Sequence, residues 1–292
     1  MKYTQPVYRP PYEANTLLLQ VTVGCAHNKC TFCTMYRDVR FSMEKIDQIE
    51  KDIKEAKQLY EDVKRVFLVN GDAFVLYASR LKPIADLIVK YLPNVEVITM
   101  YASINNIKGK TDEELRELRE LGINDLWVGA ETGHDKTLQY LNKGFSLQDS
   151  YEQLERLNKA GIRFLFGFMF GAAGSGKGIE NAIATAKLIN TTKPIGIVPT
   201  TLGANDNSQL AKDLEGGIFK LATELEIFEE QKKLLELIDL DKVSYLGIHT
   251  INTLSFDALL PRDREKSIKR IEDAIEKLDD NFLNSVPERH SI

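Results

Sequence analysis

The stretch TLLLQVTVGCAHNKCTFC, residues 16–33, sets the interpretation of the whole chain. Its first eight residues are mostly apolar or β-branched, a pattern that predicts a buried strand of a parallel sheet. A glycine ends this strand, so Cys25, Cys30 and Cys33 are expected on the loop that follows its carboxyl end. The chain has only these three cysteines among its 292 residues. We therefore expect the three thiols to serve one purpose.

Three uses of these thiols are compatible with their spacing. The first is structural, a pair of buried thiols plus a spare. The second is a zinc site with His27 as the fourth ligand, since zinc takes four thiolate or imidazole ligands in a tetrahedron. Structural zinc usually draws on two separated ligand pairs, and the sequence has no second Cys/His pair. The third is a 4Fe–4S cluster, in which three thiolates leave one iron open to an outside ligand.

The C-x4-C-x2-C spacing, with Phe32 directly before the last cysteine, resembles the radical S-adenosylmethionine (SAM) superfamily. The commonest spacing in that superfamily is C-x3-C-x2-C, and we interpret the extra residue as a subgroup trait. The segments YRPPYEA (8–14), GCAHNKCTFCTMY (24–36) and LLPRDREK (259–266) resemble a poorly characterised group within it. Its members are often labelled as similar to oxygen-independent coproporphyrinogen III oxidase or to the Elongator catalytic subunit. The resemblance covers most of the chain but supplies no substrate.

The resemblance implies a cofactor set and a reaction type. Cys25, Cys30 and Cys33 would hold a 4Fe–4S cluster, and S-adenosyl-L-methionine would bind its open iron. Reductive cleavage of SAM would then lead to hydrogen abstraction from an unidentified substrate, in an oxygen-sensitive enzyme that needs a one-electron donor such as flavodoxin or ferredoxin. The sequence identifies no catalytic residue and leaves open whether SAM is consumed or regenerated. The alternative is a zinc- or cluster-binding sensor or binding protein without catalysis.

Alternating apolar runs and amphipathic stretches predict an α/β fold. Six buried strands are expected, at 16–23, 65–70, 95–101, 125–130, 163–170 and 195–201, with a possible seventh at 243–248. Helices are expected after Ser42 and at 79–92, 111–122, 148–160, 178–192, 225–238 and 261–281. The pattern fits an open doubly wound sheet or a barrel, and the resemblance implies a partial TIM barrel of six βα units. We expect residues 1–202 to form this core, with an N-terminal arm at 1–15, and residues 203–292 to form a C-terminal elaboration packed on it.

Ligands of parallel α/β folds bind beyond the carboxyl ends of the strands, so the residues there are candidates for the site. The second strand is followed by Gly71 and Asp72, a partial match to the segment that contacts the methionine amino group in the superfamily. An amino group requires carbonyl or carboxylate acceptors, and a glycine lets the backbone approach closely. An Asp that simply ends a strand in a turn is the alternative. Phe32 is implied as a further cofactor contact.

Two further strand ends complete the predicted cofactor site. Glu131 and Thr132 follow the fourth strand and resemble the ribose contacts of the superfamily, although Glu131 could instead pair with a lysine such as Lys136. Gly167 and Gly171, in GFMFGAAG, resemble the segment that supports the adenine, and the alternative is that they pack a helix against the strand.

Other candidate sites in the sequence are weaker. Gly171–Lys177 (GAAGSGK) has the spacing G-x4-G-K, the pattern of a nucleotide-binding P-loop. However, Gly178 follows where Ser or Thr is required for magnesium. His249 either faces the substrate or is an ordinary loop histidine, and His290 is expected in a frayed tail. The basic run from Arg262 to Arg270 alternates with acids, which favours a solvated helix face over a phosphate clamp.

Composition excludes several classes of protein. A formal charge of −5 argues against a broad electrostatic grip on nucleic acid. The sequence has no apolar run of the roughly 18 residues that a membrane span needs, and its N-terminus lacks the apolar segment of a signal peptide. We therefore expect a cytoplasmic protein with no membrane partner, where three closely spaced cysteines favour a metal site over disulfides.

Overall fold

The computed structural model of the chain describes residues 1–4 and 6–289, so His290 lies outside the described residues. They divide into two compact units. The first comprises Met1–Asn28, Tyr36–Gly129 and Glu152–Leu165, and the second comprises Lys29–Met35, Ala130–Tyr151 and the chain from Phe166 onward. The expected boundary between residues 202 and 203 stays a prediction.

The strands form one eight-stranded sheet, in the order β1-β4-β5-β6-β7-β8-β9-β10, and a two-stranded sheet of β2 and β3. The strands are β1 (Leu17–Gln20), β2 (Thr22–Val23), β3 (Ser42–Met43), β4 (Arg65–Val69), β5 (Val97–Ala102), β6 (Leu126–Glu131), β7 (Phe164–Phe170), β8 (Gly196–Thr201), β9 (Val243–Leu246) and β10 (Asp257–Leu260). Pairing is parallel between β1 and β4, β4 and β5, β5 and β6, and β8 and β9, while β10 is antiparallel to β9.

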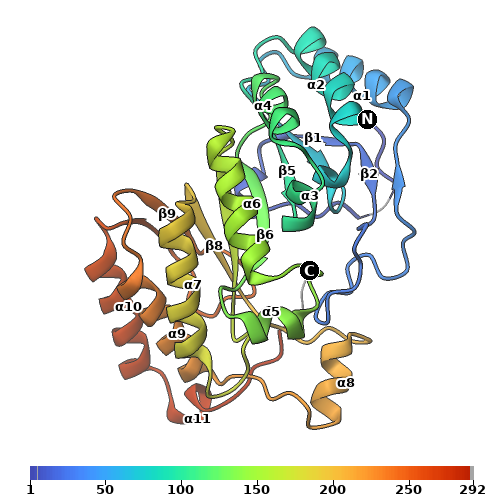
Figure 1. Cartoon of the computed structure of the whole chain (residues 1–292). Coiled ribbons are helices and arrows are strands. Elements are labelled where there is room, and N and C mark those ends of the chain that lie inside the picture. The colour runs from blue at the N-terminus through green and yellow to red at the C-terminus, as the bar shows by residue number, and fades with distance from the viewer. Residues whose placement is uncertain (5, 290–292) are drawn as a thin grey trace. The chain divides into compact units, whose positions relative to one another are not determined.

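Helices separate the successive strands of the larger sheet from β1 to β9 (Figure 1). They are α1 (Ile46–Leu59), α2 (Ala78–Tyr91), α3 (Ile104–Lys108), α4 (Asp112–Glu120), α5 (Asp135–Leu141), α6 (Leu147–Lys159), α7 (Gly178–Thr192), α8 (Gln209–Glu215), α9 (Glu224–Leu237), α10 (Arg264–Lys277) and α11 (Asp280–Leu283). Two 3-10 turns, Pro11–Glu13 and Ala73–Val75, complete the elements. At least one helix follows each of the strands β1, β4, β5, β6, β7 and β8 before the next strand of the larger sheet. This alternation confirms the α/β fold.

The first unit is built on buried strands covered by amphipathic helices. Val66 and Phe67 of β4 are fully buried, as expected for an inner strand of a parallel sheet. Helix α1 buries one stripe, Ile49, Ile53 and Ala56, and packs against α2 (Figure 1). Full burial of one such aliphatic side chain contributes about 1.5–3 kcal/mol, so this stripe is a main reason why the segment folds as a helix.

The expected helix start at Ser42 is wrong. Ser42 and Met43 form β3, which pairs antiparallel with β2, and α1 begins only at Ile46 with Lys45 as its N-cap residue. A serine before an apolar stripe suggests a helix N-cap. Ser42 instead pairs with Val23 in the two-stranded sheet and does not cap α1. By contrast, the helix expected at 111–122 begins at a capping box, in which Thr111 and Glu114 bond reciprocally.

The second unit continues the alternation and adds an antiparallel strand. The possible strand at 243–248 is confirmed as β9, whereas β10 was not predicted. Helix α9 packs against both α7 and α10, and the three lie side by side in Figure 1. Its buried face carries Phe228, Leu234 and Leu235, and also the acid Glu230.

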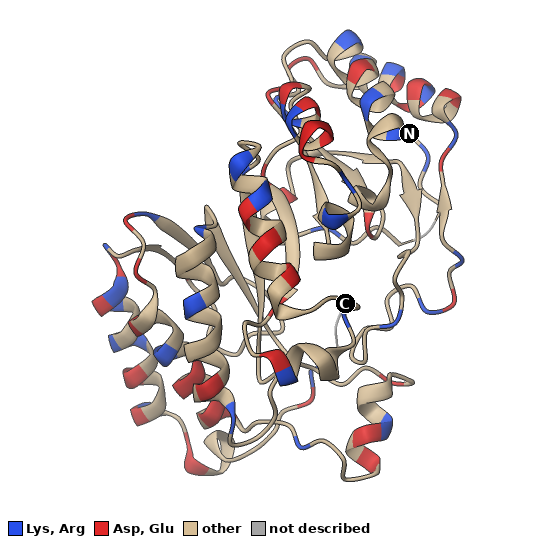
Figure 2. Cartoon of the chain, in the orientation of Figure 1, with Lys and Arg blue, Asp and Glu red and all other residues tan. Residues whose placement is uncertain are grey.

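Charge is carried mainly by the helices. In Figure 2 the strands are almost entirely tan, while α1, α4 and α10 carry acidic and basic residues together. Mixed signs on exposed helix faces give local ion pairs such as Lys54–Glu50 and Lys269–Asp273. Among the described residues, none of the helices is long and apolar enough to cross a membrane.

Candidate functional site

In the first unit, the start of the cysteine loop contacts the residue that follows β4. A Cβ atom added at Gly71 would lie 2.0 Å from the carbonyl oxygen of Gly24 and 3.3 Å from the backbone nitrogen of Cys25. Gly71 also has a φ of +64° and donates its N–H to the hydroxyl of Tyr36 at 2.9 Å. The structure therefore brings Cys25 and Gly71 together, and no side chain fits between them.

Asp72 lies beside a buried lysine in the same unit. Asp72 is 8% exposed, and its Oδ2 accepts a hydrogen bond from Asn106 at 3.2 Å. Lys110 donates to the carbonyl oxygens of Phe74 and Asn106. Burial lowers the pKa of Lys110 to about 8, although Asp72 and Glu114 act in the opposite direction. Asp72 is thus anchored by Asn106 and lies near the side chain of Lys110.

In the second unit, the loop of Cys30 and Cys33 is held by backbone bonds from two directions. Thr31 donates its N–H to the carbonyl of Leu141 at the end of α5, and its own carbonyl accepts from Leu210 in α8. Asn142 donates to the carbonyl of Lys29 at 2.9 Å. The two cysteines are half-buried, and the loop that carries them is fixed at its backbone.

Glu131 and Lys143 form an ion pair beside this loop. Lys143 Nζ lies 2.8 Å from Glu131 Oε1, and both side chains are nearly buried. Burial opposes the charge of the lysine, but Glu131 and Cys30, followed by Cys33, outweigh it, so the pKa of Lys143 is raised. The partner of Glu131 is therefore Lys143, not Lys136. Lys143 was not among the predicted site residues, because a single lysine in a loop has no sequence pattern that indicates its partner.

Phe32 packs into a small apolar cluster at the same place. The cluster consists of Leu141, Met169, Ala172, Leu202 and Leu210, with Phe32 and Tyr140 among the half-buried side chains that pack against it. Lys143 Nζ also lies 5.9 Å from the centre of the Phe32 ring. The structure thus groups Phe32 and Glu131 with residues that follow β7 and β8.

The remaining predicted cofactor residues differ in accessibility. Thr132 is fully buried, and its hydroxyl donates to Asn181 and accepts from the N–H of His134. Gly171 follows β7, and a Cβ atom there would lie 2.9 Å from Ile227 of α9, which is the helix packing expected as its alternative role. Gly167 lies half-buried within β7. The cofactor contacts of these three residues stay predictions.

The P-loop pattern at Gly171–Lys177 has its anion position filled by a side chain of the protein. Glu226 Oε1 accepts hydrogen bonds from the N–H of Gly176 at 2.5 Å and from the hydroxyl of Ser175 at 3.0 Å. In a nucleotide-binding loop such N–H groups bind phosphate. This arrangement argues against the nucleotide-binding interpretation.

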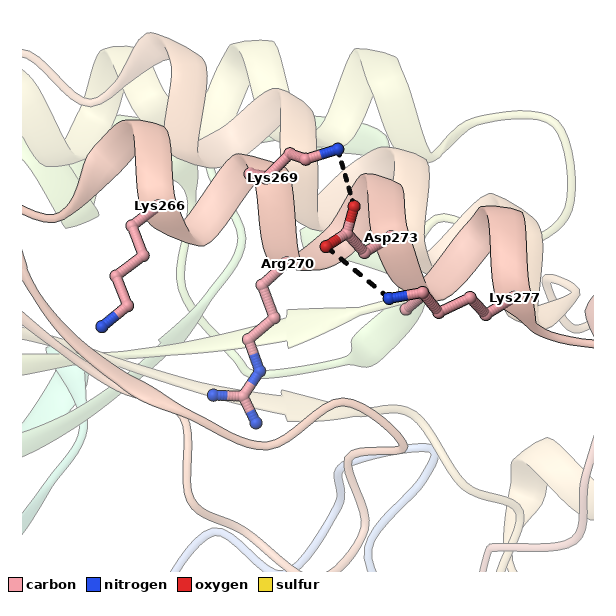
Figure 3. A pocket seen from close by; sticks show the side chains of 6 residues that line it. Lys266, Lys269, Arg270, Asp273 and Lys277 are labelled. Atoms are coloured by element: carbon pink, nitrogen blue, oxygen red, sulfur yellow. Dashed lines mark ion pairs between the residues drawn. The ribbon is translucent and has the colours of Figure 1, made fainter.

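The basic run of α10 lines a shallow surface hollow of about 470 Å³. Figure 3 shows Asp273 between Lys269 and Lys277, at 2.7 and 3.9 Å. Arg270 packs instead over the ring of Phe256, 5.2 Å from its centre. Both lysines are strongly exposed, so the run has the character of a solvated helix face, as expected.

His249 lies in the loop between β9 and β10. Its Nδ1 accepts the N–H of Ile251 at 3.3 Å, and burial lowers its pKa. The hydrogen bond orients the ring, but it does not decide between a role toward substrate and an ordinary loop role.

The donor set suits an iron–sulfur cluster, although the structure does not assemble it. Among the described residues, no group of three or more His, Cys, Asp or Glu side chains is gathered as a metal site requires. Cys25 belongs to one unit, and Cys30 and Cys33 belong to the other. The sulfurs are nevertheless present as free thiols, and their thiolates are the ligands that hold such clusters.

Comparison with protein families gives a match to the radical SAM superfamily over residues 19–188. Among individual proteins, an uncharacterised protein of Methanocaldococcus jannaschii is 27% identical over 65% of this chain and 59% of its own length. The heme chaperone HemW of Bacillus subtilis is 29% identical over 45% of this chain and 35% of its own. The chain therefore spans less than two thirds of the length of these relatives.

Solved structures show the same fold at low sequence identity. Elp3 of Methanocaldococcus infernus has a TM-score of 0.56 and 14% identity, covering 88% of this chain and 63% of its own. Coproporphyrinogen III oxidase of Escherichia coli, described as a radical SAM enzyme, has a TM-score of 0.55 and 16% identity, covering 76% and 52%. These similarities confirm the predicted partial TIM barrel.

Proposed function

Because the chain belongs to the radical SAM superfamily, we propose that it is an enzyme that binds a 4Fe–4S cluster through Cys25, Cys30 and Cys33. It would cleave S-adenosyl-L-methionine and abstract hydrogen from an unidentified substrate. One observation carries the proposal. The family match spans residues 19–188, more than half of the chain, and includes its only three cysteines.

A 4Fe–4S cluster held by this chain would supply chemistry that the side chains cannot. When reduced, it would provide the electron for cleavage of SAM into methionine and a 5′-deoxyadenosyl radical. The residues of the chain bind and orient. The three thiolates would hold three irons, and Gly71 and Asp72 would accept the methionine amino group. Phe32, with Gly167 in β7 and Gly171 after it, would support the adenine, and the segment of Glu131 and Thr132 would contact the ribose.

A one-electron donor of the flavodoxin or ferredoxin type is part of this proposal. The chain has no cysteines beyond the three of the loop. It therefore lacks thiolates for a second cluster that could store an electron internally. Reducing equivalents would have to come from another molecule.

A second candidate function is binding without catalysis. It is favoured by the similarity to HemW of Bacillus subtilis, which is named a heme chaperone. In this alternative the chain would carry a cluster, a zinc ion or a heme as cargo or sensor and would leave SAM intact.

The test is anaerobic reconstitution followed by reduction with dithionite in the presence of SAM. The proposed function predicts a brown protein with about four irons per chain and formation of 5′-deoxyadenosine. Single Ser variants of Cys25, Cys30 and Cys33 should lose iron and cleavage together. A colourless protein that holds one zinc would refute the proposal, and a brown protein that binds SAM but leaves it intact would favour the second candidate.

A further inference from the structure

A chain of hydrogen bonds in the second unit joins the ends of β6 and β7 through α9. Glu230 of α9 accepts from the N–H of Gly171 at 2.7 Å with one carboxyl oxygen, and from the side-chain amide of Asn181 at 2.6 Å with the other. Asn181 of α7 in turn accepts the hydroxyl hydrogen of Thr132. Two strand ends that were predicted to bind the cofactor are thus connected by one buried carboxyl group.

The side chains of this chain of bonds are shut off from solvent. Thr132, Asn181 and Glu230 are each 0% exposed. Burial raises the pKa of Glu230 to about 8, while the hydrogen bonds from Gly171 and Asn181 act against this shift. Burying an acid is costly, so its place here needs a reason. Glu230 offers two acceptor oxygens to two donors, one from each neighbouring element, which an apolar side chain cannot do.

The surroundings leave little freedom for these groups to move. A Cβ atom at Gly133 would lie 2.4 Å from the carbonyl oxygen of Ala184 in α7. Gly133 also donates its N–H to Thr185 of α7 at 2.8 Å. At the start of α7, a Cβ atom at Gly178 would lie 3.1 Å from the Cβ of Glu230. The turn after β6, helix α7 and helix α9 are therefore packed backbone to side chain around the carboxyl group.

We propose that Glu230 is a positioning residue: through Thr132 and Gly171, which are themselves buried, it holds the ends of β6 and β7 in the geometry in which these strand ends bind SAM. This inference rests on the proposed function and deepens it. Glu230 itself has no access to a ligand and acts through Asn181 and Gly171. Since α9 lies within residues 203–292, the C-terminal part of the chain then contributes to the cofactor site and is more than an addition to the barrel.

The test measures binding of S-adenosylhomocysteine to iron-free protein by titration calorimetry, so that cluster content does not enter. Glu230→Gln keeps the shape but places an amide donor against the amide donor of Asn181. We expect affinity to fall about tenfold, as for a mispaired buried hydrogen bond, with a melting temperature within a few degrees of the wild type. Glu229→Gln is the matched control, because Glu229 is the exposed neighbour on the same helix, and it should bind as the wild type does.

A rescue variant separates positioning from general damage. Adding Asn181→Asp to Glu230→Gln exchanges the donor and acceptor sides of the same hydrogen bond and leaves the net charge unchanged. The amide at position 230 then donates to the new carboxylate at 181, which still accepts from Thr132. Affinity should return to within about threefold of the wild type. Asn181→Leu, which breaks the chain of bonds at another point, should show the tenfold loss even if Glu230→Gln is insoluble.

The outcomes distinguish failure of the positioning role from failure of the proposed function. Wild-type affinity in Glu230→Gln or in Asn181→Leu, or a double variant that stays as weak as Glu230→Gln, overturns the positioning role while the proposed function stands. A wild-type protein that binds neither S-adenosylhomocysteine nor iron overturns the proposed function, and the positioning role with it.

Discussion

Lys143 and Glu131 form a nearly buried ion pair, 2.8 Å long, next to the backbone that carries Cys30 and Cys33. The carboxylate belongs to the last residue of β6 and the ammonium follows α5, so the pair closes the connection between this strand and its helix. Burial acts against the charge of Lys143, but Glu131 outweighs it and keeps the lysine protonated. The pair therefore contributes to the stability of the protein.

Replacing Lys143 by Met should destabilise the protein by about 3 kcal/mol, because the Glu131 carboxylate would be left in a nearly buried position without its cation. Urea unfolding followed by circular dichroism measures the loss. Lys136→Met is the control, since Lys136 is exposed on the following helix, and it should change stability by less than about 0.5 kcal/mol. Equal effects of the two substitutions would contradict the importance of the pair.

Gly71→Ala should cost about 2–5 kcal/mol, since it combines a positive φ, worth about 1–2 kcal/mol, with overpacking against Gly24, worth about 1–3 kcal/mol. Gly217→Ala is the comparison. Gly217 has nearly the same φ, +66°, but no atom lies within 4 Å of its added Cβ, so only the conformational cost of about 1–2 kcal/mol applies. Denaturant midpoints of the two variants measure the difference, and similar midpoints would show that the contact with Gly24 is loose.

Glu230 should make the stability of the protein depend on pH. Its pKa is raised to about 8 in the folded chain from the ordinary value of 4.5, so the folded state binds more protons than the unfolded state between these values. Stability is then highest below pH 4.5 with respect to this group and falls as pH rises toward 8, by up to about 1.4 kcal/mol per pH unit.

Glu230→Gln removes this dependence, because the amide does not titrate. Urea unfolding at pH 5.5, 6.5 and 7.5 should therefore show the variant at its greatest disadvantage at pH 5.5. The gap between wild type and variant should narrow as pH rises. A gap that stays constant over this range would mean that Glu230 is ionised in the folded protein.

Arg289→Met should destabilise the protein by about 3–5 kcal/mol, because it leaves Glu224, 0% exposed, without its cation. Arg289 also donates to the carbonyl of Ile251 and to Thr253, so the segment before residue 290 is held to the loop between β9 and β10. Arg262→Met breaks the exposed pair with Asp263 and should cost less than about 1 kcal/mol. Thermal melts compare the two variants directly, and a shift for Arg262→Met as large as that for Arg289→Met would speak against the difference in burial.

The sequence predicted those elements whose pattern repeats over several turns or residues. Strand β4 was expected at 65–70 and lies at Arg65–Val69, and α7 lies at Gly178–Thr192, as expected. Strand β4 buries four consecutive apolar side chains, and α7 buries one face at helical spacing, so each pattern is visible in the sequence itself. The short helix α8, with seven residues, was missed because its position depends on contacts with the cysteine loop, such as the bond from Leu210 to Thr31.

The candidate site was predictable only in part, for a related reason. Cysteine spacing and strand ends are local features, and they led to Cys25, Gly71, Glu131 and Phe32. The partner of Glu131 depends on where the chain returns after α5, so the nearby Lys136 was considered and Lys143 was not. The same holds for Ser42, whose pairing with β2 involves residues about twenty positions earlier.

Glu226 has a consequence for how the glycine-rich turn responds to solutes. Its carboxylate belongs to the same chain as the groups that it binds, so a phosphate compound in solution would have to compete with it. The effective concentration of this carboxylate is at least of about millimolar order. The N–H of Gly176 and the hydroxyl of Ser175 are thereby already bonded, so we expect phosphate compounds to bind this turn weakly despite its P-loop spacing.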